Sequence, residues 1–190
     1  MTKAIYNGTC QICGRTHKVR SNGLLAKHGY QVSDFGFFAG TCFGSDHQPL
    51  EISCNVIADA IRMYQATAES MMQDMILLSN QPTEPKAFVS CSSWVSRSRQ
   101  VHTWKQCTLI YTDGNQITQQ YADGRTDKYG PRVAQPTEQA LLDHAFDLNK
   151  RRVVDLKKER AAVKHMVAAL EDRIANWAPK ALMPITELVC

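Results

Sequence analysis

The apolar positions divide the chain into stretches with different periods. Residues 1–50 carry only short apolar runs and no helical period. Residues 51–81 and 136–178 place apolar side chains at alternating spacings of four and three, which is the pattern of a helix with one apolar face. Residues 82–135 are rich in β-branched and aromatic residues with Asp-Gly turns, which is typical of antiparallel strands. The pattern therefore predicts two helices separated by a β-rich insertion.

The second predicted helix is long and regular. Thr137 is a suitable N-cap after Pro136, and Pro179 ends the helix. Its apolar stripe covers about 36 residues, or about 54 Å at 1.5 Å per residue. Two polar residues interrupt the stripe, and such residues commonly fix the register of a coiled coil. The stripe consists of Leu142, Phe146, Asn149, Val153, Leu156, Arg160, Val163, Val167, Leu170, Ile174 and Trp177.

The first predicted helix is shorter. Ser53 is a plausible N-cap, and Pro82 and Pro85 end the helix. Antiparallel pairing of the two helices leaves part of the longer stripe to be covered by the β insertion, a second copy of the chain or a foreign partner. The shorter stripe consists of Ile57, Ile61, Tyr64, Ala68, Met71, Met75 and Leu78.

These elements predict an α+β fold. We expect a long antiparallel coiled-coil helix pair, with the small antiparallel β insertion between its two helices and an N-terminal zinc finger. The segments are the finger (1–50), the first helix (51–81), the insertion (82–135), the long helix (136–178) and a C-terminal tail (179–190).

Composition restricts the class of protein. The chain has 190 residues, 44% of them hydrophobic, and a formal net charge of +4. A disordered or fibrous chain is excluded by that apolar content, and no apolar run approaches the length of a transmembrane helix. The start MTKAIYNGTC lacks the apolar core of a signal peptide, so we expect a cytoplasmic protein. Seven cysteines in a reducing compartment favour a metal site over disulfides.

The cysteines at positions 10 and 13 indicate where that site lies. Cys10-Gln-Ile-Cys13-Gly14 is a zinc-knuckle type of turn, in which two thiolates face one ion. Tetrahedral Zn²⁺ needs two further ligands, for which His17, His28, Cys42, His47 and Cys54 are candidates. We favour Cys10, Cys13, His28 and Cys42 because each lies near a glycine, with His47 as the alternative to His28. Three thiolates and one imidazole would close the site to water, so the predicted zinc is structural.

The residues around these ligands resemble a known signature. CQICGRTHKV, LAKHGYQV, GFFAGTCFGSD and QPLE, within residues 10–51, are similar to CxxCGR, LxxHGY, GxCxG and PxE. That signature belongs to uncharacterised small zinc-finger proteins of phages, prophages and plasmids. The resemblance implies zinc ligation by Cys10, Cys13, His28 and Cys42. It also implies an origin in mobile genetic elements and a bacterial host cell, but no activity.

Basic and aromatic residues suggest where nucleic acid or a partner would bind. Cations on the finger suit phosphate contacts, and interleaved tryptophans and cations in the insertion suit stacking of single-stranded bases. The insertion residues can equally form a hairpin whose tryptophans pack under the sheet. The candidate contact residues are Arg15, Lys18, Arg20, Trp94, Arg97, Arg99, Trp104 and Lys105.

The chain carries no nucleophile–base pair, phosphate-binding loop or HExxH motif, so we expect no enzymatic activity. The leading hypothesis is an interaction protein that docks on a host macromolecular complex and modulates or inhibits it, in host takeover or anti-defence. The alternatives are direct nucleic-acid binding through the finger and the Trp/Arg hairpin, and a structural homodimer assembled through the coiled coil.

Overall fold

A computed structural model describes residues 6–31, 38–96, 99–112, 115–127 and 130–184, and its fold is α+β as the sequence predicts. Contacts divide the chain into two compact units. The first unit comprises Met1–Thr67 with Val163–Cys190, and the second comprises Ala68–Ala162. Both long helices run through both units. None of the helices in the described ranges is long and apolar enough to span a bilayer.

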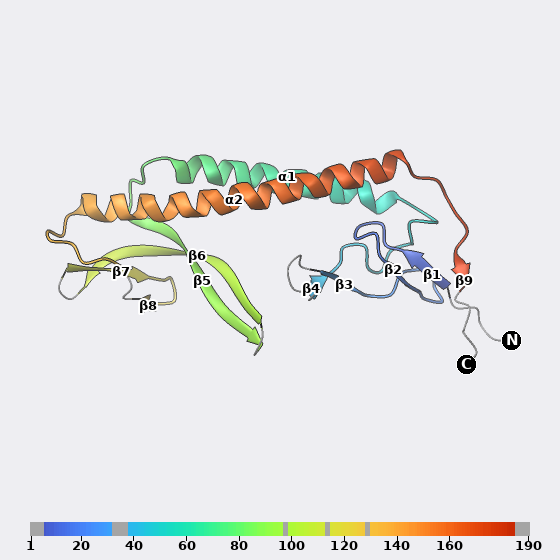
Figure 1. Ribbon diagram of the computed structural model, residues 1–190, viewed down its shortest axis with the longest axis horizontal. Coiled ribbons are helices and arrows are strands. Elements are labelled where there is room, and N and C mark those ends of the chain that lie inside the picture. The colour runs from blue at the N-terminus through green and yellow to red at the C-terminus, as the bar shows by residue number, and fades with distance from the viewer. Residues whose placement is uncertain (1–5, 32–37, 97–98, 113–114, 128–129, 185–190) are drawn as a thin grey trace. The chain divides into compact units, whose positions relative to one another are not determined.

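The two helices are α1 (Asn55–Ser79) and α2 (Glu138–Ala175), and both predicted helices are confirmed (Figure 1). In the first unit, Ile57 and Ala60 of α1 pack with Leu170 of α2. In the second unit, Arg160 Nε of α2 donates to Ala68 O of α1 at 3.0 Å. Residue numbers fall on α2 as they rise on α1, so the pair is antiparallel. Arg160 is a polar residue within the apolar stripe, and its guanidinium binds the backbone of the facing helix α1.

The first unit contains short antiparallel strands around the cysteines. β1 is the centre of a sheet with the order β2-β1-β9, and β3 pairs with β4 in a hairpin. Short strands of this kind bury little apolar surface by themselves. The strands are β1 (Tyr6–Thr9), β2 (Thr16–Val19), β3 (Gly29–Gln31), β4 (Phe38–Thr41) and β9 (Met183–Pro184).

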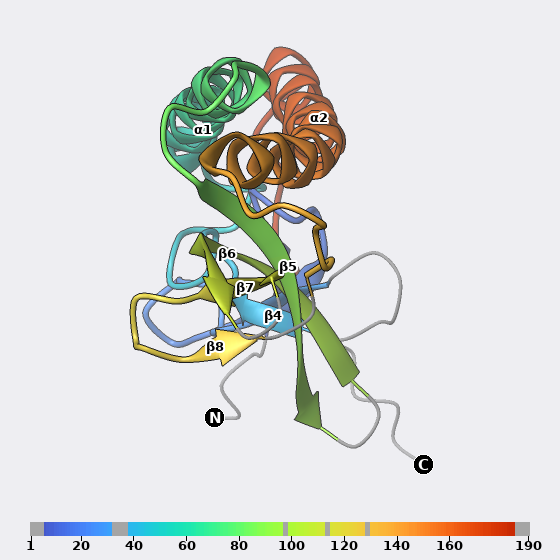
Figure 2. The same cartoon turned by 90° about the vertical axis from the view of Figure 1, so that its left-hand side faces the viewer.

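The second unit contains the predicted β insertion. It is an antiparallel sheet with the order β5-β6-β7-β8, and β5 and β6 form a long ribbon that leads away from the helix pair (Figure 2). Asn115 and Gly124 adopt positive φ angles of 59° and 81° in the connections on either side of β7. The strands are β5 (Lys86–Ser96), β6 (Arg99–Thr112), β7 (Gln116–Gln120) and β8 (Thr126–Asp127).

The first half of α2 covers this sheet. Leu141 and Ala145 of α2 are buried in one cluster with strand residues. The buried Asn149 turns its amide to the edge of β5, where Oδ1 accepts from Phe88 N at 2.9 Å and Nδ2 donates to Lys86 O at 3.3 Å. Asn149 therefore joins the helix to the sheet edge. The strand members of the cluster are Ala87, Val89, Cys107, Leu109 and Ile117, with Tyr121 just after β7.

The longer stripe is covered within the chain only in part. Asn149 bonds to the edge of β5, and Leu170 packs with α1 and with Ile12 of the finger, whereas Ile174 is 37% exposed. The α2 residues that pack on the sheet, Leu141 and Ala145, lie beside the stripe. Val167, another residue of the stripe, is only 9% exposed. Burial of these residues weakens the argument from an uncovered stripe both to a foreign partner and to a homodimer, and both stay predictions.

Candidate metal centre

The ends of two hairpins bring four ligand residues together. Cys10 follows β1 and Cys13 precedes β2, whereas His28 precedes β3 and Cys42 follows β4. Backbone bonds close both pairs: Gly14 N donates to Cys10 O at 3.0 Å, and Cys42 N donates to His28 O at 2.8 Å. Gly14 has a φ of 71°, which its lack of a side chain allows.

The spacing of the donor atoms suits a tetrahedral ion. The donors of Cys10, Cys13, His28 and Cys42 all lie within 4.8 Å of one another. The Cys10 and Cys42 sulfurs are 3.8 Å apart, and Cys13 Sγ is 3.6 Å from His28 Nε2. Tetrahedral Zn²⁺ would place two sulfurs about 3.8 Å apart, and a sulfur and a nitrogen about 3.5 Å apart. The cluster can therefore hold a metal ion such as zinc.

Contacts around the ligands fix their orientation. His28 Nδ1 lies 2.9 Å from Ala26 O and 3.2 Å from Ser45 Oγ, which leaves Nε2 directed toward the cysteines. Such a partner sets the tautomer and ring orientation of a metal-binding histidine. At Gly44, a Cβ atom would lie 2.3 Å from Cys10 Sγ, so the sulfur requires a glycine at this position.

Burial and mutual contacts shift the protonation of the metal-free thiols. The bond to Cys42 and burial raise the pKa of Cys10 to about 12. The same bond lowers the pKa of Cys42, and burial raises that of Cys13. Relative to a free cysteine, these shifts favour the thiolate at Cys42 and the protonated thiol at Cys10 and Cys13. A bound metal must displace those protons, so its affinity falls as the pH falls.

The two residues between Cys10 and Cys13 connect the centre to both helices. Gln11 is buried, and its Oε1 accepts a hydrogen bond from Val56 N of α1 at 3.0 Å. Arg173 Nη1 of α2 donates to Gln11 O at 2.6 Å and to Ile12 O at 2.8 Å. Ile12 packs against the cluster formed by Ile57, Ala60 and Leu170. The knuckle turn is therefore bonded to the beginning of α1 and to the last turns of α2.

The other predicted ligand candidates lie outside the cluster. The cluster of donor atoms contains His28 and not His47. The ring of His47 lies 6.0 Å from the ring of Phe43, and its backbone carbonyl accepts a hydrogen bond from Leu25 N. Cys54 packs beside the Ile57–Leu170 contact. His17 stacks on His28 with ring centroids 3.6 Å apart, and its Nε2 is 3.8 Å from Cys13 Sγ. Burial lowers the pKa of His17, and the neighbouring charges of His28 and Arg15 lower it further.

The predicted contact residues fall in both units, the finger cations in the first and the Trp/Arg residues in the second. Arg20 is ion-paired with Asp46, Lys18 is exposed, and Arg15 is half-buried. The guanidinium carbon of Arg152 lies over the Trp104 ring, 5.3 Å from the ring centroid. Its Nη1 forms an ion pair with Glu159 Oε1 at 2.6 Å.

The other predicted contacts lie in the segment that contains β5 and β6. Arg152 covers one face of Trp104, which also lines a cavity, and Lys105 is exposed. Base stacking on Trp104 stays a prediction. Arg97 lies outside the described residues, as do the side chains of Trp94 and Arg99.

Sequence reasoning missed Gln11 and Arg173. Gln11 lies inside a recognisable metal motif, but no local pattern indicates that it caps a helix 45 positions away. Arg173 has no distinguishing neighbour in the sequence.

Comparisons with known proteins give no match: no family model, no curated protein and no solved structure matches this chain.

Proposed function

We propose that Cys10, Cys13, His28 and Cys42 hold one structural Zn²⁺ ion. Four protein ligands complete a tetrahedral shell and leave no position for a reacting water molecule. The observation that carries the proposal is that the four donor atoms all lie within 4.8 Å of one another. The knuckle is also connected to α1 through Gln11 and to α2 through Arg173. An ion that fixes this turn also fixes the ends of both helices.

Metal analysis tests the zinc assignment. The purified chain is expected to contain one zinc ion per molecule and, after exchange, to show the charge-transfer bands of tetrahedral Co²⁺–thiolate coordination. Cys13→Ala should abolish both, whereas Cys54→Ala, a cysteine outside the cluster, should retain both. Equal metal content in the two variants would refute the assignment.

We further propose that the chain is a non-enzymatic interaction protein of the mobile-element type. In this role it docks on a host macromolecular complex and modulates or inhibits it. The resemblance of residues 10–51 to phage, prophage and plasmid finger proteins supports the origin. Apolar side chains on the helices support the docking role: Leu77 is 70% exposed, and Ile76 and Val154 are about half exposed. Exposed apolar residues of this kind are available to a protein partner.

Capture from host lysate, with and without nuclease, tests this role. One host complex recovered in both arms, and lost with Leu77→Glu but not with Leu77→Gln, is the expected result. Capture that disappears with nuclease would favour direct nucleic-acid binding. Recovery of only the chain itself would favour a self-assembling homodimer.

A further inference from the structure

The outer edge of β5 is an unpaired strand edge in the second unit. Among the residues that the structure describes, β5 pairs only with β6, in constant register from Lys86↔Thr108 to Trp94↔Gln100. The amide of Asn149 bonds to Lys86 O and Phe88 N, so these two residues turn their backbone groups away from β6. The N–H and C=O groups of one residue point to the same side of an antiparallel strand, and successive residues alternate. Ser90 and Ser92 therefore also turn their N–H and C=O groups outward, beyond the point where Asn149 ends the pairing.

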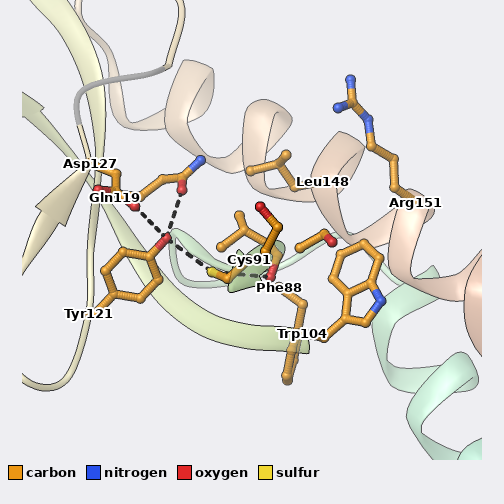
Figure 3. Close-up of a pocket in the computed structure, with 11 residues that line it drawn as sticks. Phe88, Cys91, Trp104, Gln119, Tyr121, Asp127, Leu148 and Arg151 are labelled. Atoms are coloured by element: carbon orange, nitrogen blue, oxygen red, sulfur yellow. Dashed lines mark hydrogen bonds between the residues drawn. The ribbon is translucent and has the colours of Figure 1, made fainter. Parts of the chain in front are cut away.

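A cavity of about 590 Å³ opens beside this edge (Figure 3). It is lined by the five consecutive β5 residues 88–92, with Leu148 and Arg151 of α2 on the opposite side. Side chains alternate between the two faces of a strand, so a cavity on one face would be lined by every second residue. Lining by consecutive residues means that the backbone edge itself faces the cavity. A groove between a strand edge and a helix is the arrangement in which extended peptides bind by strand addition.

The ends of the cavity differ in chemistry. Trp104 and Arg151 lie at one end, and Tyr121, Asp127 and Gln119 lie at the other (Figure 3). Asp127 Oδ2 is 3.0 Å from the Tyr121 hydroxyl, so this carboxylate already has a partner.

The charges next to the cavity favour an acidic occupant. Within the run Lys150-Arg151-Arg152, Lys150 pairs with Asp147 and Arg152 pairs with Glu159. Arg151 is exposed, and it forms no ion pair with any carboxylate in the described part of the chain. A carboxylate supplied by a ligand would complete the pairing of this run.

We propose that β5 binds an extended acidic peptide segment of a partner protein by strand addition. The segment pairs with the outward backbone groups of Ser90 and Ser92, which follow the β5 residues that Asn149 binds. One large apolar side chain of the segment enters the cavity beside Trp104, and an acidic side chain pairs with Arg151. The inference rests on the proposed interaction function and names the kind of segment recognised.

A matched pair of variants tests the backbone pairing. Ser90→Pro removes one outward N–H and leaves the β5–β6 ladder intact, because proline is tolerated on edge strands where its nitrogen faces away from the neighbour. Ser90→Ala keeps the N–H. The probe is a short capped peptide of alternating glutamate and valine with a central phenylalanine, and binding to the full zinc-loaded chain is followed by fluorescence anisotropy.

Wild type and Ser90→Ala are expected to bind equally, and Ser90→Pro about tenfold more weakly. Arg151→Gln, and a peptide with lysine in place of glutamate, should each weaken binding severalfold. Equal binding by a folded Ser90→Pro variant, or no binding by wild type, would overturn the proposal.

Amide exchange of the wild-type chain gives a second measurement that does not depend on the folding of a variant. The Ser90 and Ser92 amides should exchange quickly in the free chain and slowly with the peptide bound. Unchanged exchange would overturn the proposal. Protection that rises with protein concentration in the absence of peptide would also overturn it, since a second copy of the chain would then occupy the edge.

Lysate capture separates this inference from the proposed function. Loss of the host complex with Ser90→Pro but not with Ser90→Ala, together with peptide binding, supports strand addition. Capture that survives Ser90→Pro but not Leu77→Glu would overturn strand addition and leave the proposed interaction function standing.

Discussion

The finger and the β insertion are both small β structures, but different interactions hold them together. Buried residues of the finger cluster are Cys10, Leu25 and Cys42, and two of these three are candidate metal ligands. The sheet cluster buries eight residues, including Leu109 and Ile117. In the described part of the chain, it contains no group of side chains that could hold a metal ion. Apolar burial supplies about 25 cal/mol per Å². We therefore expect the stability of the finger to depend on a bound ion and the stability of the sheet to depend on packing against α2.

Metal removal should produce the largest difference between the two regions. EDTA is expected to unfold the finger, because structural zinc contributes about 10 kcal/mol or more of apparent folding free energy at neutral pH. Hydrogen exchange measures the effect by residue: the Leu25 amide, which donates to His47 O, should lose protection, and the Leu109 amide should keep it. Simultaneous loss at both amides would show that the sheet also depends on the metal.

Truncation in the sheet core should produce the second largest effect. Leu109 is 1% exposed, so Leu109→Ala leaves a cavity and should reduce the free energy of unfolding of the second unit by about 2–5 kcal/mol. Denaturant unfolding in zinc and in EDTA should show the same loss. Leu77→Ala is the control, with an expected change within about 0.5 kcal/mol. A loss that depends on zinc would contradict the separation of the two regions.

The two regions should respond to pH in opposite directions. Zinc keeps protons off the finger thiols, while an unfolded chain rebinds them, so the stability of the zinc-loaded finger rises with pH. In the sheet, burial raises the pKa of Cys107 from 9.0 to about 11, with a smaller contribution from Cys91. The folded sheet thus favours the protonated thiol, and this stability is present below the unfolded pKa and lost as the pH rises from 9.0 toward 11.

Unfolding of the second unit between about pH 8 and about pH 11 measures this response. The expected loss is about 2–3 kcal/mol, and Cys107→Ala should reduce the slope. A slope that is unchanged in Cys107→Ala would assign the loss to another group. Tyr121 is the first alternative, because burial and its bonds to Cys91 and Asp127 also raise its pKa.

Removal of the Arg173 contact should produce the smallest effect. Arg173→Ala leaves the carbonyls of Gln11 and Ile12 without this donor and should reduce the stability of the first unit by about 1–3 kcal/mol. Thermal unfolding of the zinc-loaded chain and the rate of zinc release to a chelator measure the loss. Arg151→Ala, on the same helix but with no ion pair in the described chain, is the matched control. Equal behaviour of the two variants would show that α2 does not support the knuckle.

Local patterns were sufficient for the two helices and the strands of the insertion, and for three of the four ligands of the candidate centre, but not for the short strands of the finger. The 4-3 spacing of apolar residues identified both helices to within a few residues, because one face of a helix must be buried along its whole length. The Cys-x2-Cys turn and its neighbouring glycines identified Cys10, Cys13, His28 and Cys42, since close approach of backbone to sulfur restricts the residue types. The spacing left His28 and His47 as alternatives, and the hairpin geometry brings only His28 to the cysteines.

Periodicity and spacing within short segments thus predict the two helices and the strands of the insertion, and they restrict the candidate metal ligands to Cys10, Cys13, Cys42 and one of two histidines. Tertiary structure alone decided that Gln11 caps α1, that Arg173 supports the knuckle and that Asn149 binds the edge of β5. The sequence around a polar side chain in a helix or turn does not indicate which distant group that side chain will bind. Those partners lie between 45 and 162 positions away, where only the folded chain brings donor and acceptor together.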